Sequence, residues 1–197
     1  MTIYDLKPAF QNLLRPIVNM MAVKGITPNQ VTFAAMVLSI AVGALIALSK
    51  GAVFALFTVP VFLFIRMALN AIDGMLAKEH DLKSDAGAVL NEMGDVISDA
   101  GLYLPLVFID GVDPIAVVLF VIVGIFTEMT GILGAALKQD RRYDGPMGKS
   151  DRAFLVGALC LLWALGVHPA LWSTLLLYAG TLLGVKTVLN RWKGALA

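Results

Sequence analysis

The sequence predicts an all-α integral membrane protein with six transmembrane helices, preceded by an N-terminal interfacial amphipathic helix. Of its 197 residues, 59% are hydrophobic, and the mean hydropathy is +0.84. These residues gather into runs close to the roughly 20 residues that cross a bilayer. The single cysteine, Cys160, excludes an intrachain disulfide. A net charge of +1 gives no indication of a nucleic-acid partner, and none is expected.

Residues 1–24 are expected to form a helix that lies on the membrane surface. Apolar residues such as Phe10, Leu13 and Leu14 recur at roughly helical intervals, but two prolines and three basic residues interrupt the apolar run that a signal peptide needs. A loosely ordered leader is the alternative. Thr27 and Pro28 suit the cap and the first turn of the next helix, so residues 25–197 are expected to form the transmembrane domain.

Six apolar segments follow, and each is expected to span the membrane. Their predicted bounds are residues 30–49, 52–77, 87–109, 114–137, 153–167 and 171–190. The fifth is short and needs a few residues from Ser150 onward. With this topology Lys50 is the only basic loop residue on one side of the membrane, so the positive-inside rule places both termini on the cytoplasmic side.

A group of polar residues stands inside apolar sequence at the end of the second segment and the start of the third. Asn70, Asp73 and Ala77 share one helical face, and polar or small residues then recur at four-residue intervals. This second set is Gly87, Asn91, Asp95 and Asp99. Two helices joined by the turn-like segment 78–85 would aim these groups at each other. Because carboxylates are costly inside a membrane, the cluster predicts a functional site, paired with a cation or a metal and facing the cytoplasm.

This spacing resembles the CDP-alcohol phosphatidyltransferase family, whose motif is Asp-x2-Asp-Gly-x2-Ala-Arg-x8-Gly-x3-Asp-x3-Asp. The chain has the same frame without gaps, at Asn70, Asp73, Gly74, Ala77, Lys78, Gly87, Asn91 and Asp95. It departs from the motif at three positions, with Asn for the first and third Asp and Lys for Arg. The resemblance implies transfer of a phosphatidyl group from a CDP-linked lipid, CDP-diacylglycerol in particular, to a cytoplasmic alcohol with release of CMP.

The resemblance also implies roles for individual residues. It implies metal ligands at Asn70, Asp73, Asn91 and Asp95, with Asp73 and Asp95 catalytic and Asp95 a ligand or the base that accepts the alcohol proton. It implies contacts with the nucleotide and diphosphate at Gly74, Ala77, Lys78 and Gly87, and, through a short Pro-Asn-x-x-Thr element, at Asn29 and Thr32. A helix cap and a packing threonine explain the last two equally well. The implied cofactor is Mg²⁺ or Mn²⁺, one ion or two, and one is simpler because Asn ligates without neutralising charge.

A basic segment precedes the fifth apolar run. Its cations, Lys138, Arg141, Arg142, Lys149 and Arg152, surround a turn-rich stretch. Exposed amides and cations there favour an anion, and the stretch resembles the loop of family members whose acceptors are sugar or polyol phosphates. A polyol or polyol phosphate acceptor is therefore expected. Positive-inside topology and contacts with anionic lipid explain the same charges.

Three further charged residues lie within the apolar segments. Arg66, Asp99 and Glu128 fall at similar depths, which predicts an intramembrane network. It would form either a structural floor beneath the site or a fixed cation that replaces part of the missing metal charge. A catalytically impaired CDP-lipid-binding protein or assembly partner remains an alternative function, and a transporter is a poorer one because no inverted repeat is visible. The resemblance also implies a homodimer in a bacterial inner membrane.

Overall fold

The computed structural model describes residues 3–138 and 140–196, with side chains from Pro8 onward, and within these residues it contains helices and loops but no strand. Its elements in chain order are α1 (Ile3–Val23), α2 (Pro28–Ser49), α3 (Val53–Glu79), α4 (Asp85–Tyr103), the 3₁₀ segment η1 (Leu104–Phe108), α5 (Pro114–Lys138), α6 (Lys149–Ala164) and α7 (Leu171–Leu196). The all-α prediction is confirmed. The outermost ends of the predicted segments 1–24 and 25–197 lie outside the described residues.

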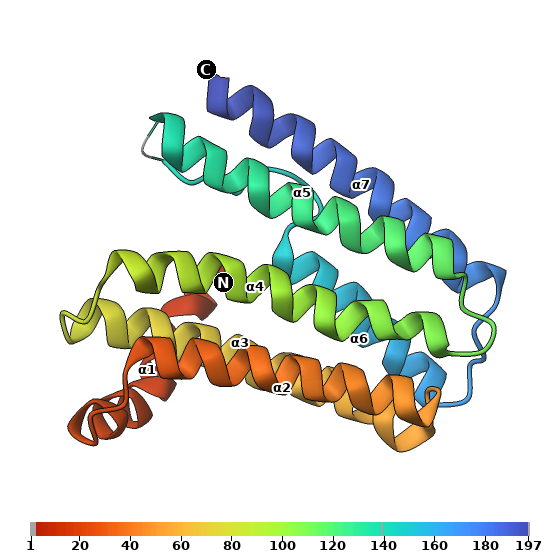
Figure 1. Ribbon diagram of the computed structural model, residues 1–197, viewed down its shortest axis with the longest axis horizontal. Coiled ribbons are helices and arrows are strands. Elements are labelled where there is room, and N and C mark those ends of the chain that lie inside the picture. The colour runs from red at the N-terminus through yellow and green to blue at the C-terminus, as the bar shows by residue number, and fades with distance from the viewer. Residues whose placement is uncertain (1–2, 139, 197) are drawn as a thin grey trace.

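Helices α2 to α7 form an elongated bundle (Figure 1). α2 packs against both α3 and α4, α3 also packs against α6, and α5 packs against α7. Tyr103 and Phe120 are among the large buried side chains of the main hydrophobic core, where their rings lie 6.5 Å apart. The apolar side chains therefore hold the six helices together while the polar residues gather elsewhere.

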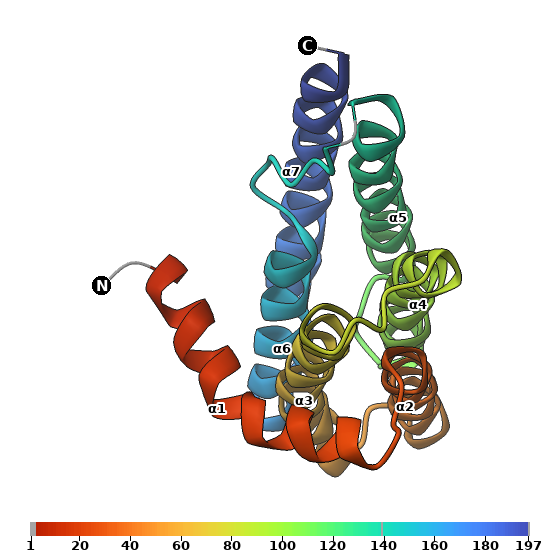
Figure 2. The same cartoon turned by 90° about the vertical axis from the view of Figure 1, so that its left-hand side faces the viewer.

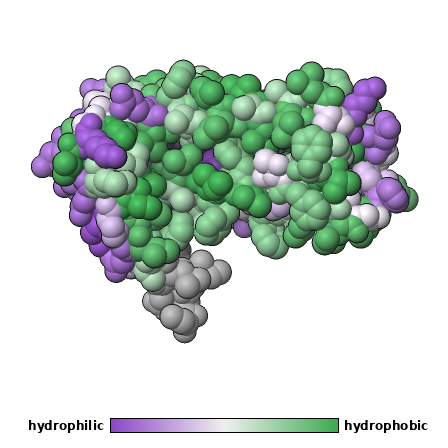
Figure 3. All heavy atoms as spheres, turned by 90° about the horizontal axis from the view of Figure 1, so that it is seen from below, coloured by the Kyte–Doolittle hydropathy of each residue, from purple (hydrophilic) through white to green (hydrophobic). Residues whose placement is uncertain are grey.

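Four helices in the described part of the chain, α2, α3, α5 and α7, are long and apolar enough to cross a bilayer. Helix α6 has 16 residues, fewer than the roughly 20 that a full crossing needs. Six spans therefore remain a prediction. Figure 3 shows apolar side chains over the middle of the visible face and polar side chains near its two ends, as expected where a bilayer surrounds the middle.

Helix α1 crosses the side of the bundle near α3 instead of running along it (Figure 2). Its buried Leu14 and Val18 pack in one cluster with Ile72 and Leu76 of α3. Arg15 adds a salt bridge of 3.0 Å to Glu79 at the end of α3. The structure thus supplies a helix where residues 1–24 were predicted to form one, whereas its place on the membrane surface remains a prediction.

Two predicted helix boundaries are wrong. The third apolar segment was expected to continue to Ile109, but α4 ends at Tyr103 and a 3₁₀ turn follows. Pro105 lies in that turn, and a proline has no N–H to continue an α-helix. The fifth segment ends at Ala164 instead of Val167, whereas its start at Lys149 agrees with the expectation that residues from Ser150 onward belong to it.

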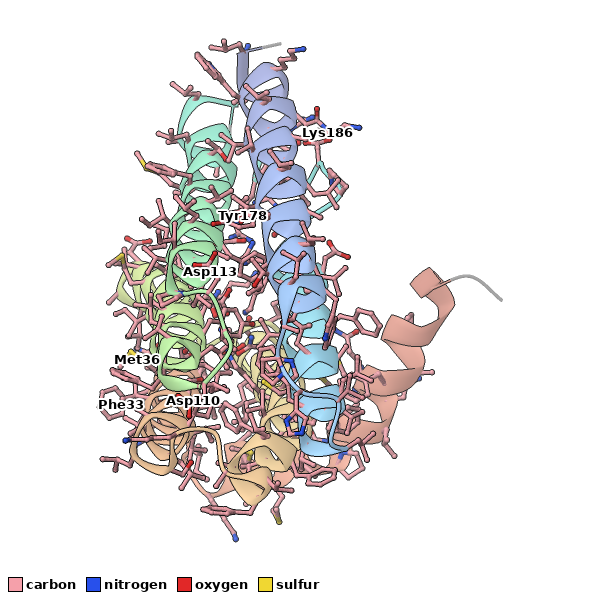
Figure 4. The ribbon with its side chains drawn as sticks, turned by 90° about the vertical axis from the view of Figure 1, so that its right-hand side faces the viewer. Phe33, Met36, Asp110, Asp113, Tyr178 and Lys186 are labelled. Atoms are coloured by element: carbon pink, nitrogen blue, oxygen red, sulfur yellow. The ribbon has the colours of Figure 1, made fainter. Side chains whose placement is uncertain are left out.

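Side chains fix the helix ends that position the site. Thr27 caps α2 as predicted, because its hydroxyl accepts a hydrogen bond from Gln30 N while the Gln30 side chain accepts one from Thr27 N. At the opposite end of the molecule Asp113 accepts from Ile115 N at 2.9 Å and from the Tyr178 hydroxyl at 3.1 Å. Figure 4 labels Asp113 and Tyr178, where the start of α5 lies beside α7. This bond ties the start of α5 to α7 at the end of the molecule opposite Thr27.

Candidate active site

A cavity of about 970 Å³ lies at the end of the bundle where α3 turns into α4, on the left of Figure 1. Its walls come from the starts of α2, α4 and α6, the ends of α3 and α7, and the loop before α6. Every residue of the predicted motif lines it, namely Asn70, Asp73, Gly74, Ala77, Lys78, Gly87, Asn91 and Asp95. Asn29 and Thr32 line it as well. The structure thus brings the two halves of the motif to one site.

A tight connection between α3 and α4 creates this arrangement. Asp81 adopts a left-handed backbone conformation with φ of 55°, and Ser84 caps α4 by accepting from Gly87 N at 3.0 Å. The chain therefore reverses within a few residues. Across the helix pair, Asn70 Nδ2 donates to Asp95 Oδ1 at 3.4 Å, which joins the first and last motif positions directly.

The carboxylate of Asp73 is buried and has a specific partner. Thr32 Oγ1 lies 2.9 Å from Asp73 Oδ2 and 3.1 Å from the Pro28 carbonyl oxygen, so its one proton serves either acceptor. The predicted nucleotide contact Thr32 is thus placed where it holds Asp73. Because a hydroxyl bonded to a carboxylate limits its rotation, Asp73 presents its remaining oxygen to the cavity in a defined orientation.

The carboxylate of Asp95 lies among cations. Lys149 Nζ donates to Asp95 Oδ1 in a salt bridge, and Arg66 Nη2 lies 3.8 Å from the same oxygen. Arg66 also donates to the Asp95 carbonyl oxygen at 3.2 Å. Lys149 was expected among the acceptor-binding residues, and in the structure it lines the cavity and pairs with Asp95. Sequence reasoning missed this pair because Asp95 and Lys149 are 54 residues apart and meet only in the folded chain.

Two of the motif glycines differ in their surroundings. A Cβ atom on Gly74 would meet no atom within 4 Å, so this position leaves open space at the cavity wall. A Cβ atom on Gly87 would lie 2.8 Å from Asn29 Oδ1. Gly74 therefore allows a ligand to approach the backbone, whereas Gly87 allows the Asn29 side chain to reach α4.

The oxygen atoms that line the cavity could hold a divalent ion only in part. Within the described residues, no three His, Cys, Asp or Glu side chains form a group that would hold a metal. Two carboxylates, Asp73 and Asp95, and two amides, Asn70 and Asn91, line the cavity. Lys149 already neutralises Asp95. Mg²⁺ commonly takes one or two carboxylates and completes its coordination with water and substrate phosphate oxygens, so this set fits one ion rather than two.

The three predicted network residues belong to one chain of ion pairs beneath the cavity. Arg66 donates to Asp99 at 2.6 Å, and Arg152 donates to Asp99 at 3.0 Å and to Glu128 at 2.9 Å. Arg152 was expected to bind the acceptor, but it is buried and connects Asp99 with Glu128. A small cavity beside these groups is also bordered by Tyr103, whose buried hydroxyl has no hydrogen-bond partner among the described residues.

The other cations of the basic segment have different positions. Arg141 lines the cavity and donates to Glu92 at 2.7 Å and to Glu128 at 3.0 Å. Burial alone disfavours its charge, but Tyr143 and the two glutamates keep the pKa of Arg141 above its ordinary value. Arg142 pairs with Asp144 at 2.8 Å outside the cavity lining, and Lys138 is exposed at the end of α5.

Sequence reasoning missed two contributors to the site. Arg191 of α7 lines the cavity and donates a hydrogen bond to the Thr127 carbonyl oxygen at 2.5 Å. Glu92 accepts a hydrogen bond from Arg141, which also lines the cavity. In the sequence Arg191 is one of three cations near the end of α7, with Lys186 and Lys193, and their spacing does not single it out. Nothing in the local spacing indicates the partner of Glu92.

Four helices long and apolar enough to cross a bilayer, with a polar cavity at one end of the bundle, are typical of a membrane protein. The chain belongs to the CDP-alcohol phosphatidyltransferase family, whose model matches residues 25–192. The predicted family is therefore confirmed, and the chain is a membrane protein of the phosphatidyltransferase class.

Similar proteins agree with this assignment. Over 200 residues the chain is 42% identical to the inner membrane protein YnbA of Escherichia coli strain K12, covering 100% of this chain and 97% of YnbA. The phosphatidylinositol phosphate synthase PgsA1 of Mycobacterium tuberculosis, solved with CDP-DAG bound, has a TM-score of 0.77 at 18% identity and covers 92% of both chains. A second PgsA1 structure, with manganese and citrate, has a TM-score of 0.77 at 19% identity and covers 92% of this chain and 88% of PgsA1. These structures share the fold.

Proposed function

We propose that the protein transfers a phosphatidyl group from a CDP-linked lipid, CDP-diacylglycerol, to a polyol or polyol phosphate, with release of CMP. The observation that carries the proposal is the cavity in which the complete motif frame of the family converges at the polar end of the bundle. That CDP-DAG is bound by PgsA1, which has the same fold, supports the choice of donor lipid.

Binding of the donor is assigned to the start of α2 and the junction of α3 and α4. Lys78 offers a single positive charge to a phosphate, without the bidentate geometry of an arginine. Gly74 leaves room for the diphosphate beside the backbone, and Ala77, Asn29 and Gly87 complete the wall for the nucleotide. Holding the diphosphate next to the acceptor would supply much of the rate enhancement through proximity.

We assign one divalent ion, Mg²⁺ or Mn²⁺, to the oxygens of Asn70, Asp73 and Asn91, with Asp95 at the edge of the site. When bound, the ion supplies positive charge that stabilises the diphosphate and the leaving CMP. Thr32 orients Asp73 for this task through its hydrogen bond to Oδ2. The manganese found in a PgsA1 structure supports a divalent ion here, and the two amides support a single one.

Asp95 is assigned as the base that accepts the proton of the attacking hydroxyl. In the described part of the chain, the side-chain contacts of its carboxylate all involve Oδ1, with Lys149, Asn70 and Arg66 as partners. This leaves Oδ2 to accept the proton. Lys149 and Asn70 then fix the orientation of the carboxylate, so the base is positioned before the alcohol arrives.

The membrane arrangement follows from the same reasoning. We propose that α4 and α6 complete six spans and that the cavity and both termini face the cytoplasm, because the basic residues gather on that side. A bacterial inner membrane is supported by the relative YnbA, an inner membrane protein. The homodimer is proposed only because the resemblance to the family implies it. Soluble alcohols would then reach the cavity directly.

The test is CMP release from CDP-diacylglycerol by purified protein, with Mg²⁺, Mn²⁺ or a chelator and a pool of polyols and their phosphates. We expect metal-dependent release that Asp73→Asn and Asp95→Asn both abolish. Binding of CDP-diacylglycerol without release under any of these conditions would contradict the proposed transfer.

A second candidate function is binding of a CDP-linked lipid without catalysis, as a pseudoenzyme or assembly partner. It is favoured by the two amides at Asn70 and Asn91 and by the absence, within the described residues, of a group of three acidic or His and Cys ligands. The double variant Asn70→Asp with Asn91→Asp separates the two. Release of CMP that appears only in the double variant would favour the non-catalytic function, whereas release by the unaltered protein excludes it.

A further inference from the structure

Three arginines from three different parts of the chain converge on one buried carboxylate, that of Glu128, which lines the cavity. Glu128 of α5 lies 2.9 Å from Arg152 Nη2 and 3.0 Å from Arg141 Nη2, and Arg191 Nη1 lies 3.8 Å away. Glu128, Arg152 and Arg191 are each 4% exposed or less. The cations that would recognise an anionic acceptor are thus held by a carboxylate of the protein itself.

Small residues on α5 make this convergence possible. A Cβ atom on Gly124 would lie 3.1 Å from Arg152 Nε, and one on Gly131 would lie 3.2 Å from Arg191 Nη1. These glycines lie one turn before and one turn after Glu128, so the guanidinium groups pass over them to reach the carboxylate. The arrangement is packed closely around Glu128 instead of leaving the arginines free to turn toward a ligand.

Several of the remaining donors of these arginines also have partners, although the buried Nε of Arg141 has none among the described residues. Arg152 donates to Asp99 at 3.0 Å and to the Thr127 hydroxyl at 2.7 Å. Arg191 donates to the Thr127 and Asp144 carbonyl oxygens, at 2.5 and 3.2 Å. Arg141 donates to Glu92 at 2.7 Å. A phosphate would have to displace these acceptors and leave a buried carboxylate without its counter-ions.

The fourth cation on this side is also paired, because Lys149 forms a salt bridge with Asp95. Lys78 and Lys83 line the cavity from the α3 end and the following loop, where the donor nucleotide is assigned. A phosphate ester placed near Asp95 would therefore face paired cations and the negative charge of Glu128 and Glu92. A hydroxyl suits this wall better, since it both donates to carboxylates and accepts from guanidinium groups.

We infer that the acceptor is an uncharged polyol and that Glu128 excludes its phosphate ester by occupying Arg141, Arg152 and Arg191. This inference rests on the proposed function and narrows its acceptor to one chemical class. Specificity of this kind depends on repulsion of the wrong ligand as much as on attraction of the right one.

The first test compares matched acceptors with the purified full-length protein and CDP-diacylglycerol in mixed micelles. Glycerol is paired with glycerol 3-phosphate, and inositol with inositol phosphate. We expect the value of kcat/KM to be roughly tenfold or more higher for the uncharged member of at least one pair. Equal or better use of the phosphate esters would overturn the inference.

The second test measures binding of inorganic phosphate by calorimetry, without donor lipid, and so does not depend on turnover. We expect Glu128→Gln, which frees guanidinium groups, to bind millimolar phosphate measurably more tightly than the unaltered protein, since the donor subsite at Lys78 is the same in both. Glu79→Gln is the matched control, because it removes a carboxylate that pairs with the exposed Arg15, and neither of these two residues lines the cavity. No gain in folded Glu128→Gln, or an equal gain in Glu79→Gln, would overturn the inference.

If Glu128→Gln does not fold, Glu92→Gln replaces it, since Glu92 is partly exposed and contacts Arg141 at the cavity rim. A weaker gain in phosphate binding is then expected, and no gain counts against the inference. Failure of the proposed function would give a different result, because no CMP would then be released with any alcohol, charged or uncharged. The phosphate-binding measurement would still test the inference, since it does not depend on turnover.

Discussion

Replacing Arg66 by methionine tests whether the ion pairs beneath the cavity are a structural floor. Arg66 is 3% exposed and donates to Asp99 at 2.6 Å. Breaking a buried ion pair on one side costs about 3–5 kcal/mol because a charge is left without a partner. Asp99 retains Arg152 at 3.0 Å, so we expect the lower end of that range, about 3 kcal/mol. For a chain of this length that corresponds to a fall in melting temperature of about 6–12 °C.

The assay is thermal unfolding of the purified protein in detergent, followed by circular dichroism, together with CMP release measured well below the melting temperature. Arg15→Met is the matched control, because it removes an exposed pair with Glu79 and should leave the melting temperature unchanged. We expect Arg66→Met to retain CMP release per folded molecule, since Lys149 and Asn70 still hold Asp95. A fall of less than about 2 °C would refute the structural role. If Arg66→Met were stable but lost both CMP release and metal affinity, the result would instead support the hypothesis that Arg66 is a fixed cation replacing part of the metal charge.

Three further outcomes are expected. Asp95→Asn should lower CMP release by about 10²–10⁴-fold while CDP-diacylglycerol still binds. Full activity in this variant would exclude Asp95 as the base. Thr32→Val should lower stability by about 1–3 kcal/mol, measured by thermal unfolding, because Asp73 loses its hydroxyl partner, and an unchanged melting curve would show that water replaces it. A chelator should stop CMP release and added Mg²⁺ or Mn²⁺ should restore it, whereas release that persists in chelator would refute the metal assignment.

The convergence of the motif was predictable because it depends on local geometry. Residues spaced by three or four share a helical face, and one short reversal between α3 and α4 places Asn70 3.4 Å from Asp95. The cap at Thr27 was predictable for the same reason, since its capping box joins two residues only three positions apart, Thr27 and Gln30. The end of α4 was not, because the length of the apolar run concealed the effect of Pro105 on the last turn.

The partners of the cations depend instead on how the loop before α6 folds back. Met147 N donates to Thr187 Oγ1 of α7 at 2.9 Å, and Arg142 N donates to the Gly131 carbonyl oxygen of α5 at 3.2 Å. These contacts set the positions of Arg141 and Lys149 relative to α4. No periodicity in the sequence encodes a contact between residues 49 or 54 positions apart, so the pairs Arg141 with Glu92 and Lys149 with Asp95 required the structure.

The charges around the cavity explain how a site with two amides in the motif remains balanced. Five cations, Arg66, Arg141, Lys149, Arg152 and Arg191, connect with four carboxylates, Glu92, Asp95, Asp99 and Glu128. An aspartate at position 70 would put a second negative charge near Asp95, where like charges oppose each other unless a further cation binds. Asn70 instead donates to Asp95, and Lys149 supplies the positive charge. In the proposed assignment of one metal ion, residue 70 and Lys149 therefore set how much negative charge is left for that ion to neutralise.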